Sequence, residues 1–274
     1  QNRVFTIASP PAEEVILKRL SFAARVAGGQ IAPEAVEKLR LNVKSVVLFI
    51  DAMLRSIRDN HKIKTFINNI SGGNMRVVVD LVNGFFGSPN VDSQKIVQIE
   101  EETGSYKIPL HEFSKHALLG EYSYYNPDSS QVACNIYDIH KADPREHFLR
   151  SLIVSFLLSD TPVRTKDGLV YGGEIIVEMR SHRFDDDQIR RAMRELARRR
   201  LISTPNDAFR ELAGFEEDDD PDDFYFRPTS IGAYHVREWM GTFQFLDATA
   251  IDTPILDEKT RDTVMQVASS FEIG

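Results

Sequence analysis

The sequence predicts a mostly α-helical chain with a small amount of β-structure, an α+β fold class. Apolar residues recur at helical spacing through the first half, between stops that contain glycine. In the second half, three helical segments are followed by two short strand-like segments. The chain has 274 residues, of which 42% are hydrophobic. That is enough apolar material for two domains of ordinary size.

The first predicted domain, residues 1–103, is helical throughout. Ser9 and the prolines after it are suited to begin the first helix, and a glycine pair ends it. Asp92 is suited to cap the last helix of the domain. The predicted helices are residues 12–27, 42–59, 62–70, 74–86 and 92–102.

Residues 104–143 form a predicted mixed connector. Its segments 105–108 and 132–136 have the composition of short strands, and 109–119 is a predicted helix. A polar loop rich in tyrosine, residues 122–130, lies between them.

The second predicted domain, residues 144–245, follows another order of elements. Helices are expected at 145–158, 172–183 and 186–200, then strands at 201–204 and 224–227, then a helix at 228–240. Three helices followed by two strands around a long turn are typical of the winged helix-turn-helix fold. Residues 206–223 are the expected tip of the wing. A C-terminal helical extension, 246–274, holds a last predicted helix at 257–270.

Composition restricts the classes of function. Lys and Arg number 33 against 41 Asp and Glu, a formal net charge of −8, which argues against broad non-specific nucleic-acid binding. The single cysteine, Cys134, allows no internal disulfide, so a cytoplasmic protein is expected. No apolar run in the sequence reaches the roughly 18 residues of a membrane span. Neither a signal peptide before the first helix nor a membrane partner is expected.

The helix predicted at 186–200 is the most basic segment. Its arginines recur at helical spacing opposite an apolar stripe, at the place where a winged helix has its recognition helix. They are suited to meet phosphates or base edges. Alternatively they form a solvated face, paired with Glu195 and with Asp185 to Asp187. The predicted nucleic-acid contacts are Arg190, Arg191, Arg194 and Arg198.

The wing carries an acidic run that phosphate would repel. A solvated loop is one interpretation, and a contact with a basic surface of the same chain or of a partner is the other. We expect weak, salt-dependent DNA binding at best, and we expect the wing to fold back on the arginines or to serve a protein partner. The acidic residues are Glu216, Glu217, Asp218, Asp219, Asp220, Asp222 and Asp223.

A short motif, Ser71-Gly72-Gly73-Asn74-Met75-Arg76, precedes one helix of the first half. Two glycines allow a sharp entry into that helix. Arg76 in its first turn is either a surface arginine at a helix joint or a group that reaches an anion on a neighbouring domain.

Two segments of the first ninety residues carry a resemblance. Residues 4–11 (VFTIASPP) run into 14–19 (EVILKR), and residues 70–76 (ISGGNMR) run into Asp80-Leu81. Together they resemble the lid of AAA+ ATPases of the origin-recognition and archaeal initiator type and of the related STAND ATPases. The resemblance implies a sensor-2 role for Arg76, which would contact the γ-phosphate. It also implies a winged helix after the lid. The chain has no G-x-x-x-x-G-K-[ST] motif, so the nucleotide-binding core is missing.

These observations lead to a functional hypothesis. The chain is expected to be a C-terminal regulatory and interaction module of a larger P-loop NTPase, a reading favoured by the start at Gln1 within an apolar run. ATP and magnesium would bind the parent and not this chain. The expected partners are the ATPase core of the parent, and a protein or DNA at the winged helix. The alternatives are a stand-alone winged-helix transcription regulator and an adaptor that only joins proteins.

No catalytic or metal site is expected in the chain. His111 and His116 have a poor spacing for metal binding, and no nucleophile–base pair is evident. We therefore expect this chain alone neither to hydrolyse ATP nor to bind it measurably.

Overall fold

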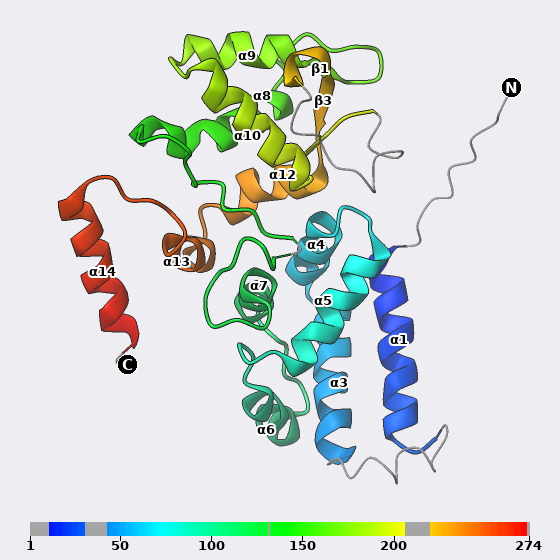
Figure 1. Ribbon diagram of the computed structural model, residues 1–274. Helices are drawn as coiled ribbons and strands as arrows, with labels where there is room; N and C mark the ends of the chain where they lie inside the picture. The colour runs from blue at the N-terminus through cyan, green and yellow to red at the C-terminus, as the bar shows by residue number, and fades with distance from the viewer. Residues whose placement is uncertain (1–10, 31–42, 131, 206–219, 273–274) are drawn as a thin grey trace, which may run out of the picture. The chain divides into compact units, whose positions relative to one another are not determined.

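The computed structural model describes residues 11–30, 43–130, 132–205 and 220–272 (Figure 1). These residues are mostly helical, with a small antiparallel sheet of three strands, so the predicted fold class is confirmed. The predicted strand at 4–7, the cap at Ser9 and most of the wing, 206–219, lie outside the described residues.

The chain divides into two compact units, Gln1–Ala133 and Cys134–Gly274. The predicted connector, 104–143, is therefore shared between the units. The predicted C-terminal extension, 246–274, belongs to the second one.

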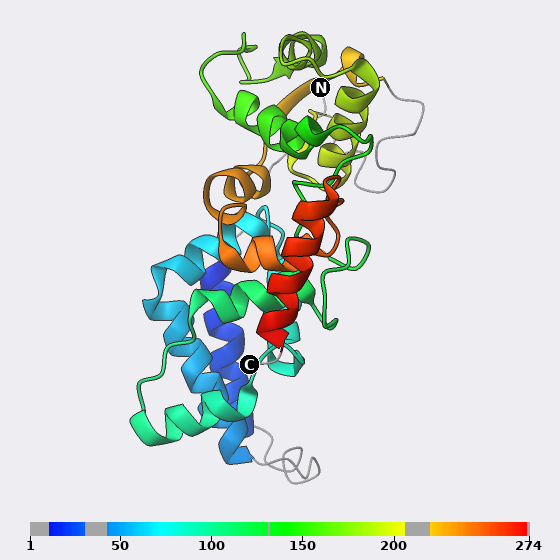
Figure 2. The ribbon, with the colours of Figure 1, turned by 90° about the vertical axis from the view of Figure 1, so that its left-hand side faces the viewer.

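The first unit consists of helices whose starts are fixed by polar side chains. The side chains of Asn60, Asn74 and Asp92 accept hydrogen bonds from backbone N–H groups in the first turns of α4, α5 and α6. Helices α1 and α3 lie side by side in both views (Figures 1 and 2). The helices are α1 (Ala12–Ala27), α3 (Val43–Asp59), α4 (His61–Ile70), α5 (Met75–Gly87), α6 (Ser93–Thr103) and α7 (Leu110–Leu119).

Aromatic side chains fill the core of the first unit. Phe66, Phe85 and Phe113 are completely buried, and the ring centroids of Phe85 and Phe113 are 4.9 Å apart. Burying a side chain of this size stabilises the fold by roughly 1.5–3 kcal/mol. These rings pack α4, α5 and α7 against one another in one core, which fixes the relative positions of the three helices.

The segment 105–108 is not a strand, so that prediction is wrong. Side chains rather than a neighbouring strand accept its hydrogen bonds. The N–H of Tyr106 donates to Glu100 Oε2 (2.9 Å), and the N–H of Ile108 donates to Ser56 Oγ (2.7 Å). Glu100 and Ser56 are both buried, and they thereby attach the segment to α6 and α3.

The segment 132–136 is not a strand either. Here too, side chains bind the backbone. The N–H of Ala133 donates to Ser130 Oγ (3.0 Å) in the first unit, and the N–H of Cys134 donates to His235 Nε2 (3.2 Å) in the second.

The second unit combines helices with the small sheet. Helix α8 packs against α9, α10 and β3. The elements are η1 (Pro144–Phe148), α8 (Leu149–Leu158), β1 (Val170–Tyr171), α9 (Gly172–Ser181), α10 (Asp186–Arg198), β2 (Ile202–Ser203), η2 (Pro221–Asp223), β3 (Tyr225–Pro228), α12 (Ser230–Tyr234), η3 (His235–Trp239), α13 (Phe243–Ala250) and α14 (Glu258–Glu272).

The strands are ordered β1-β3-β2, and both pairings are antiparallel. The predicted pairing of 201–204 with 224–227 is confirmed, because Ser203 is opposite Arg227. Strand β1 was not predicted. It adds Val170, opposite Phe226, to the other edge of β3.

The predicted helix 228–240 is divided. The α-helical turn α12 is followed by a π-helical turn, η3. Helix α13 begins before the predicted C-terminal helical extension, 246–274, and continues into it, but it was not predicted as a separate helix. The π-turn places His235 and Trp239 in the core, with ring centroids 4.9 Å apart.

Candidate functional site

Helix α10 carries the predicted nucleic-acid contacts, and its start is firmly fixed. The side chain of Asp185 accepts a hydrogen bond from Gln188 N, and the side chain of Gln188 accepts one from Asp185 N. This is the reciprocal capping box. Gln188 Nε2 also donates to the buried Glu146 (2.8 Å), which ties α10 to η1.

One face of α10 is buried in the second unit. Ile189, Met193 and Leu196 have no solvent exposure. As predicted, the arginines lie away from this apolar stripe. Arg191 and Arg198 are exposed, whereas Arg190 and Arg194 are half-buried.

Arg190 is the centre of a cluster of carboxylates. Its Nη2 lies 2.7 Å from Asp222 Oδ2, its Nε lies 3.1 Å from Asp220 Oδ1, and its Nη1 lies 3.4 Å from Asp186 Oδ2. The hydrogen bond to Asp222 is the main cause of a raised pKa at Arg190. We call the contacts of Arg190 with Asp220 and Asp222 the acidic clasp.

The acidic clasp confirms the predicted fold-back of the acidic segment for these two aspartates. Only residues 220–223 of the acidic run belong to the described part of the chain. The clasp is possible because η2 holds both aspartates in one turn, in which Asp222 N donates to Asp220 Oδ1 (3.2 Å).

Cations of the same unit also neutralise the three aspartates at the start of α10. Lys141 Nζ lies 3.0 Å from Asp185 and 3.3 Å from Asp187. Arg180 Nε donates to Asp186 Oδ1 at 2.5 Å. The hydrogen bond from Arg180 is the main cause of the lowered pKa of Asp186. These aspartates therefore present less free negative charge than the sequence indicates.

The rest of the arginine face is paired along the helix. Arg191 lies 3.5 Å from Asp187, and Arg198 lies 2.8 Å from Glu195. Partial burial raises the pKa of Glu195, but hydrogen bonds from Arg198 and Arg199 outweigh it and the pKa is lowered. Arg194 is engaged within the chain as well. The alternative of a paired, solvated face thus describes α10 well.

Arg76 has different surroundings. Gly72 and Gly73 have φ values of 58° and 80°, which side chains disfavour, and they turn the chain sharply into α5. Asn74 Oδ1 accepts from Arg76 N (2.9 Å). The Arg76 side chain is 91% exposed, and its Nε lies 3.9 Å from Asp80 Oδ2. An exposed ion pair of that length is weak, so Arg76 is available to an external anion.

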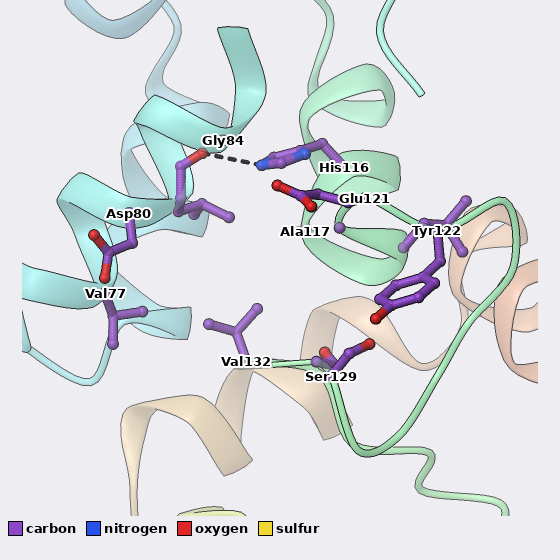
Figure 3. Close-up of a pocket in the computed structure, with 13 residues that line it drawn as sticks. Val77, Asp80, Gly84, His116, Ala117, Glu121, Tyr122, Ser129 and Val132 are labelled. Carbon is purple, nitrogen blue, oxygen red and sulfur yellow. Dashed lines mark hydrogen bonds between the residues drawn. The ribbon is translucent and has the colours of Figure 1, made fainter. Parts of the chain in front are cut away.

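A pocket in the first unit was not predicted from the sequence (Figure 3). It has a volume of about 260 Å³ and lies between α5 and the region from α7 to residue 132. His116, considered in the sequence only as a metal ligand, belongs to its wall. The described residues hold no group of three or more His, Cys, Asp or Glu arranged to bind a metal ion.

Two reactive residue types are buried in the second unit. His235 Nδ1 lies 2.8 Å from Ile231 O, and its Nε2 accepts from Cys134 N, so the ring is neutral. Burial lowers the pKa of His235 to about 4 and raises the pKa of the Cys134 thiol to about 11. Neither is placed to act as a base or a nucleophile, because both lack access to solvent.

Comparisons with known protein families, characterised proteins and solved structures gave no match. In the described part of the chain, none of the helices combines the length and the apolar character that crossing a membrane requires.

Proposed function

We propose that the chain is a regulatory and interaction module of a larger P-loop NTPase. In this proposal the first unit contains an AAA+ lid that senses nucleotide through Arg76. The second unit contains a winged helix whose α10 serves protein contacts rather than DNA. The observation that carries the proposal is the intramolecular pairing of the arginines on α10.

The order of elements supports a winged helix. Helix α8, strand β1, helices α9 and α10, and strands β2 and β3 follow one another. The sheet order β1-β3-β2 places the last two strands next to each other, around the segment expected to be the wing. In winged helices that bind DNA, the third helix enters the major groove.

The charges near α10 favour a protein partner. DNA would have to replace Asp220 and Asp222 on Arg190, and both carboxylates would stay next to the phosphates. A protein surface of mixed charge imposes no such repulsion and can pair with both signs.

The exposure of Arg76 supports the sensor role. A guanidinium that is 91% exposed and capped into the first turn of α5 can contact a phosphate on an adjoining domain at little cost. An arginine already paired with buried carboxylates could not make this contact without losing those pairs.

The first experiment tests α10 by measuring the binding of duplex DNA by fluorescence anisotropy. The wild-type chain is expected to bind weakly at about 0.15 M salt, with a Kd no tighter than the non-specific range of about 10⁻⁴–10⁻⁶ M. Under the proposed function, Asp220→Asn with Asp222→Asn should stay within this weak range even though it releases Arg190. Asp160→Asn with Asp167→Asn removes the same charge from exposed positions away from the clasp and is the matched control.

Tight binding by the wild type at that salt concentration would overturn the protein-contact reading. If the clasp variant binds tightly and the control does not, the acidic clasp is an autoinhibitor of DNA binding. That result favours the alternative of a transcription regulator.

The second experiment tests Arg76 in the complete ATPase. Arg76→Ala should reduce the nucleotide response by about tenfold or more, because one charge-assisted contact to phosphate contributes roughly 1.5–3 kcal/mol. Arg58→Ala, another exposed arginine of the first unit, is the control. Unchanged ATPase activity and assembly in Arg76→Ala would reject the sensor role.

A further inference from the structure

The pocket of the first unit combines apolar contacts with negative charge. Val77, Leu81 and Val132 supply apolar surface, and the acidic residues Asp80 and Glu121 belong to the same lining. Figure 3 shows Val77 and Asp80 on one side, His116 and Glu121 on the other, and Val132 below. Its described lining contains no lysine or arginine, and the nearest cation to Asp80 is the exposed Arg76, whose Nε lies 3.9 Å from the carboxylate. Such a site repels anions and attracts cations.

His116 belongs to the wall of the pocket. The residue is 5% exposed, and its Nε2 lies 3.0 Å from the carbonyl oxygen of Leu81. A carbonyl can only accept, so Nε2 carries the proton and Nδ1 is an acceptor. Among the described residues Nδ1 has no hydrogen-bond partner.

The ring of His116 is held in place. It stands edge-on to Phe85, with centroids 5.7 Å apart. A Cβ atom at Gly84 would lie only 3.0 Å from His116 Cε1, so the glycine provides the space for the ring. The His116 ring on α7 is therefore packed closely against α5.

We propose that this pocket binds an aliphatic cation, an amine or guanidinium carried on an alkyl stem. The stem would lie on Val77, Leu81 and Val132, and the charged head between Asp80 and Glu121. The same chemistry is presented by a small alkylamine or guanidine metabolite and by a Lys or Arg side chain of a partner protein. The site shares Asp80 with Arg76, whose Nε lies 3.9 Å from that carboxylate, so Glu121 is the acidic residue of the pocket that tests the cation site without removing the partner of Arg76.

The test is a titration of the full chain with n-butylguanidinium, followed by the NMR signals of the Gly84 and Gly120 amides and of the His116 ring. We expect saturable shifts with a Kd of about 1 mM, the strength of a single charged head with a short stem. Guanidinium ion lacks the stem and 1-pentanol lacks the charge, so neither should saturate these signals.

Two double variants test whether the carboxylates of the pocket bind the cation. Asp80→Asn with Glu121→Gln should weaken binding at least about tenfold, or roughly 1.4 kcal/mol. Glu14→Gln with Glu102→Gln removes the same charge at exposed positions of α1 and α6 and should change nothing. Absence of saturable binding to the wild type, or equal binding by the first variant, would overturn the proposal.

A titration with a peptide distinguishes a small-molecule cation from a Lys or Arg side chain of a partner protein. If acetyl-Gly-Arg-Gly-amide binds as well as n-butylguanidinium, the site accepts a partner's side chain. If only the free compound binds, the pocket takes a small molecule. Either result supports a cation site.

Discussion

At the scale of single residues, His235 shows how a buried imidazole is kept neutral. Both ring nitrogens are used within the second unit, one on Ile231 O and one on Cys134 N. Protonation would break the bond from Cys134 and place a charge in the core. This explains why its pKa is lowered from 6.5 to about 4.

The shifted pKa of His235 predicts a pH-dependent stability. Between pH 6.5 and about 4 the unfolded chain takes up a proton at this position and the folded chain does not, so the stability falls as the pH falls. His235→Gln removes this term. As the pH falls from 7 to 4, the wild type should lose up to about 3 kcal/mol more of its free energy of unfolding than His235→Gln loses.

Urea unfolding at several pH values measures this difference. His182→Gln is the control, because His182 is exposed on the second unit. Parallel pH profiles for wild type and His235→Gln would show that the imidazole is not held neutral.

At the scale of elements, α12 approaches Leu201, the residue before β2, so closely that only glycine fits at position 232. A Cβ atom there would overlap the carbonyl oxygen of Leu201. That carbonyl cannot move away easily, because it accepts hydrogen bonds from Thr229 N (3.1 Å) and Thr229 Oγ1 (3.0 Å).

Gly232→Ala should therefore destabilise the second unit by about 2–3 kcal/mol, the usual effect of overpacking against a fixed neighbour. Thermal unfolding measures it. Gly241→Ala is the matched control, since a Cβ atom at that turn has open space around it. Equal melting temperatures for the two variants would contradict the close approach.

Local signals decided which elements could be predicted. Helices with a polar cap and a glycine stop, such as α6 between Asp92 and Gly104, are encoded within a few residues, and their bounds followed from the sequence. Strand β1 has only two residues and carries no periodicity. The error at 105–108 arose because Glu100 and Ser56 bind its backbone, and Ser56 is distant in the sequence.

At the scale of the whole molecule, a net charge of −8 opposes any polyanion. If the clasp variant gains DNA binding, the gain should depend strongly on salt, because log K falls by about 0.9 per phosphate contacted for each unit of log salt. A gain that is independent of salt would point to something other than Arg190 on the DNA backbone.

The sequence predicted that the acidic segment pairs with arginines of the second unit, but not which residues form the ion pairs. Opposite charges on 186–200 and 216–223 indicated an interaction, yet the selection of Arg190 by Asp220 and Asp222 depends on the turn in η2. The pocket of the first unit could not be predicted, because its lining is drawn from α5, from α7 and from the segment that follows α7.

Labelling of the Cys134 thiol can measure how often the second unit opens locally. Its thiol is 2% exposed, and burial raises its pKa to about 11, so a closed molecule offers almost no thiolate to an alkylating reagent. Because the sequence contains one cysteine, all labelling takes place at Cys134 and reports opening around that residue. When closing is faster than labelling, the rate of modification measures the equilibrium population of the open state. Mass spectrometry of untagged protein would then rank variants such as Gly232→Ala under native conditions, without denaturant.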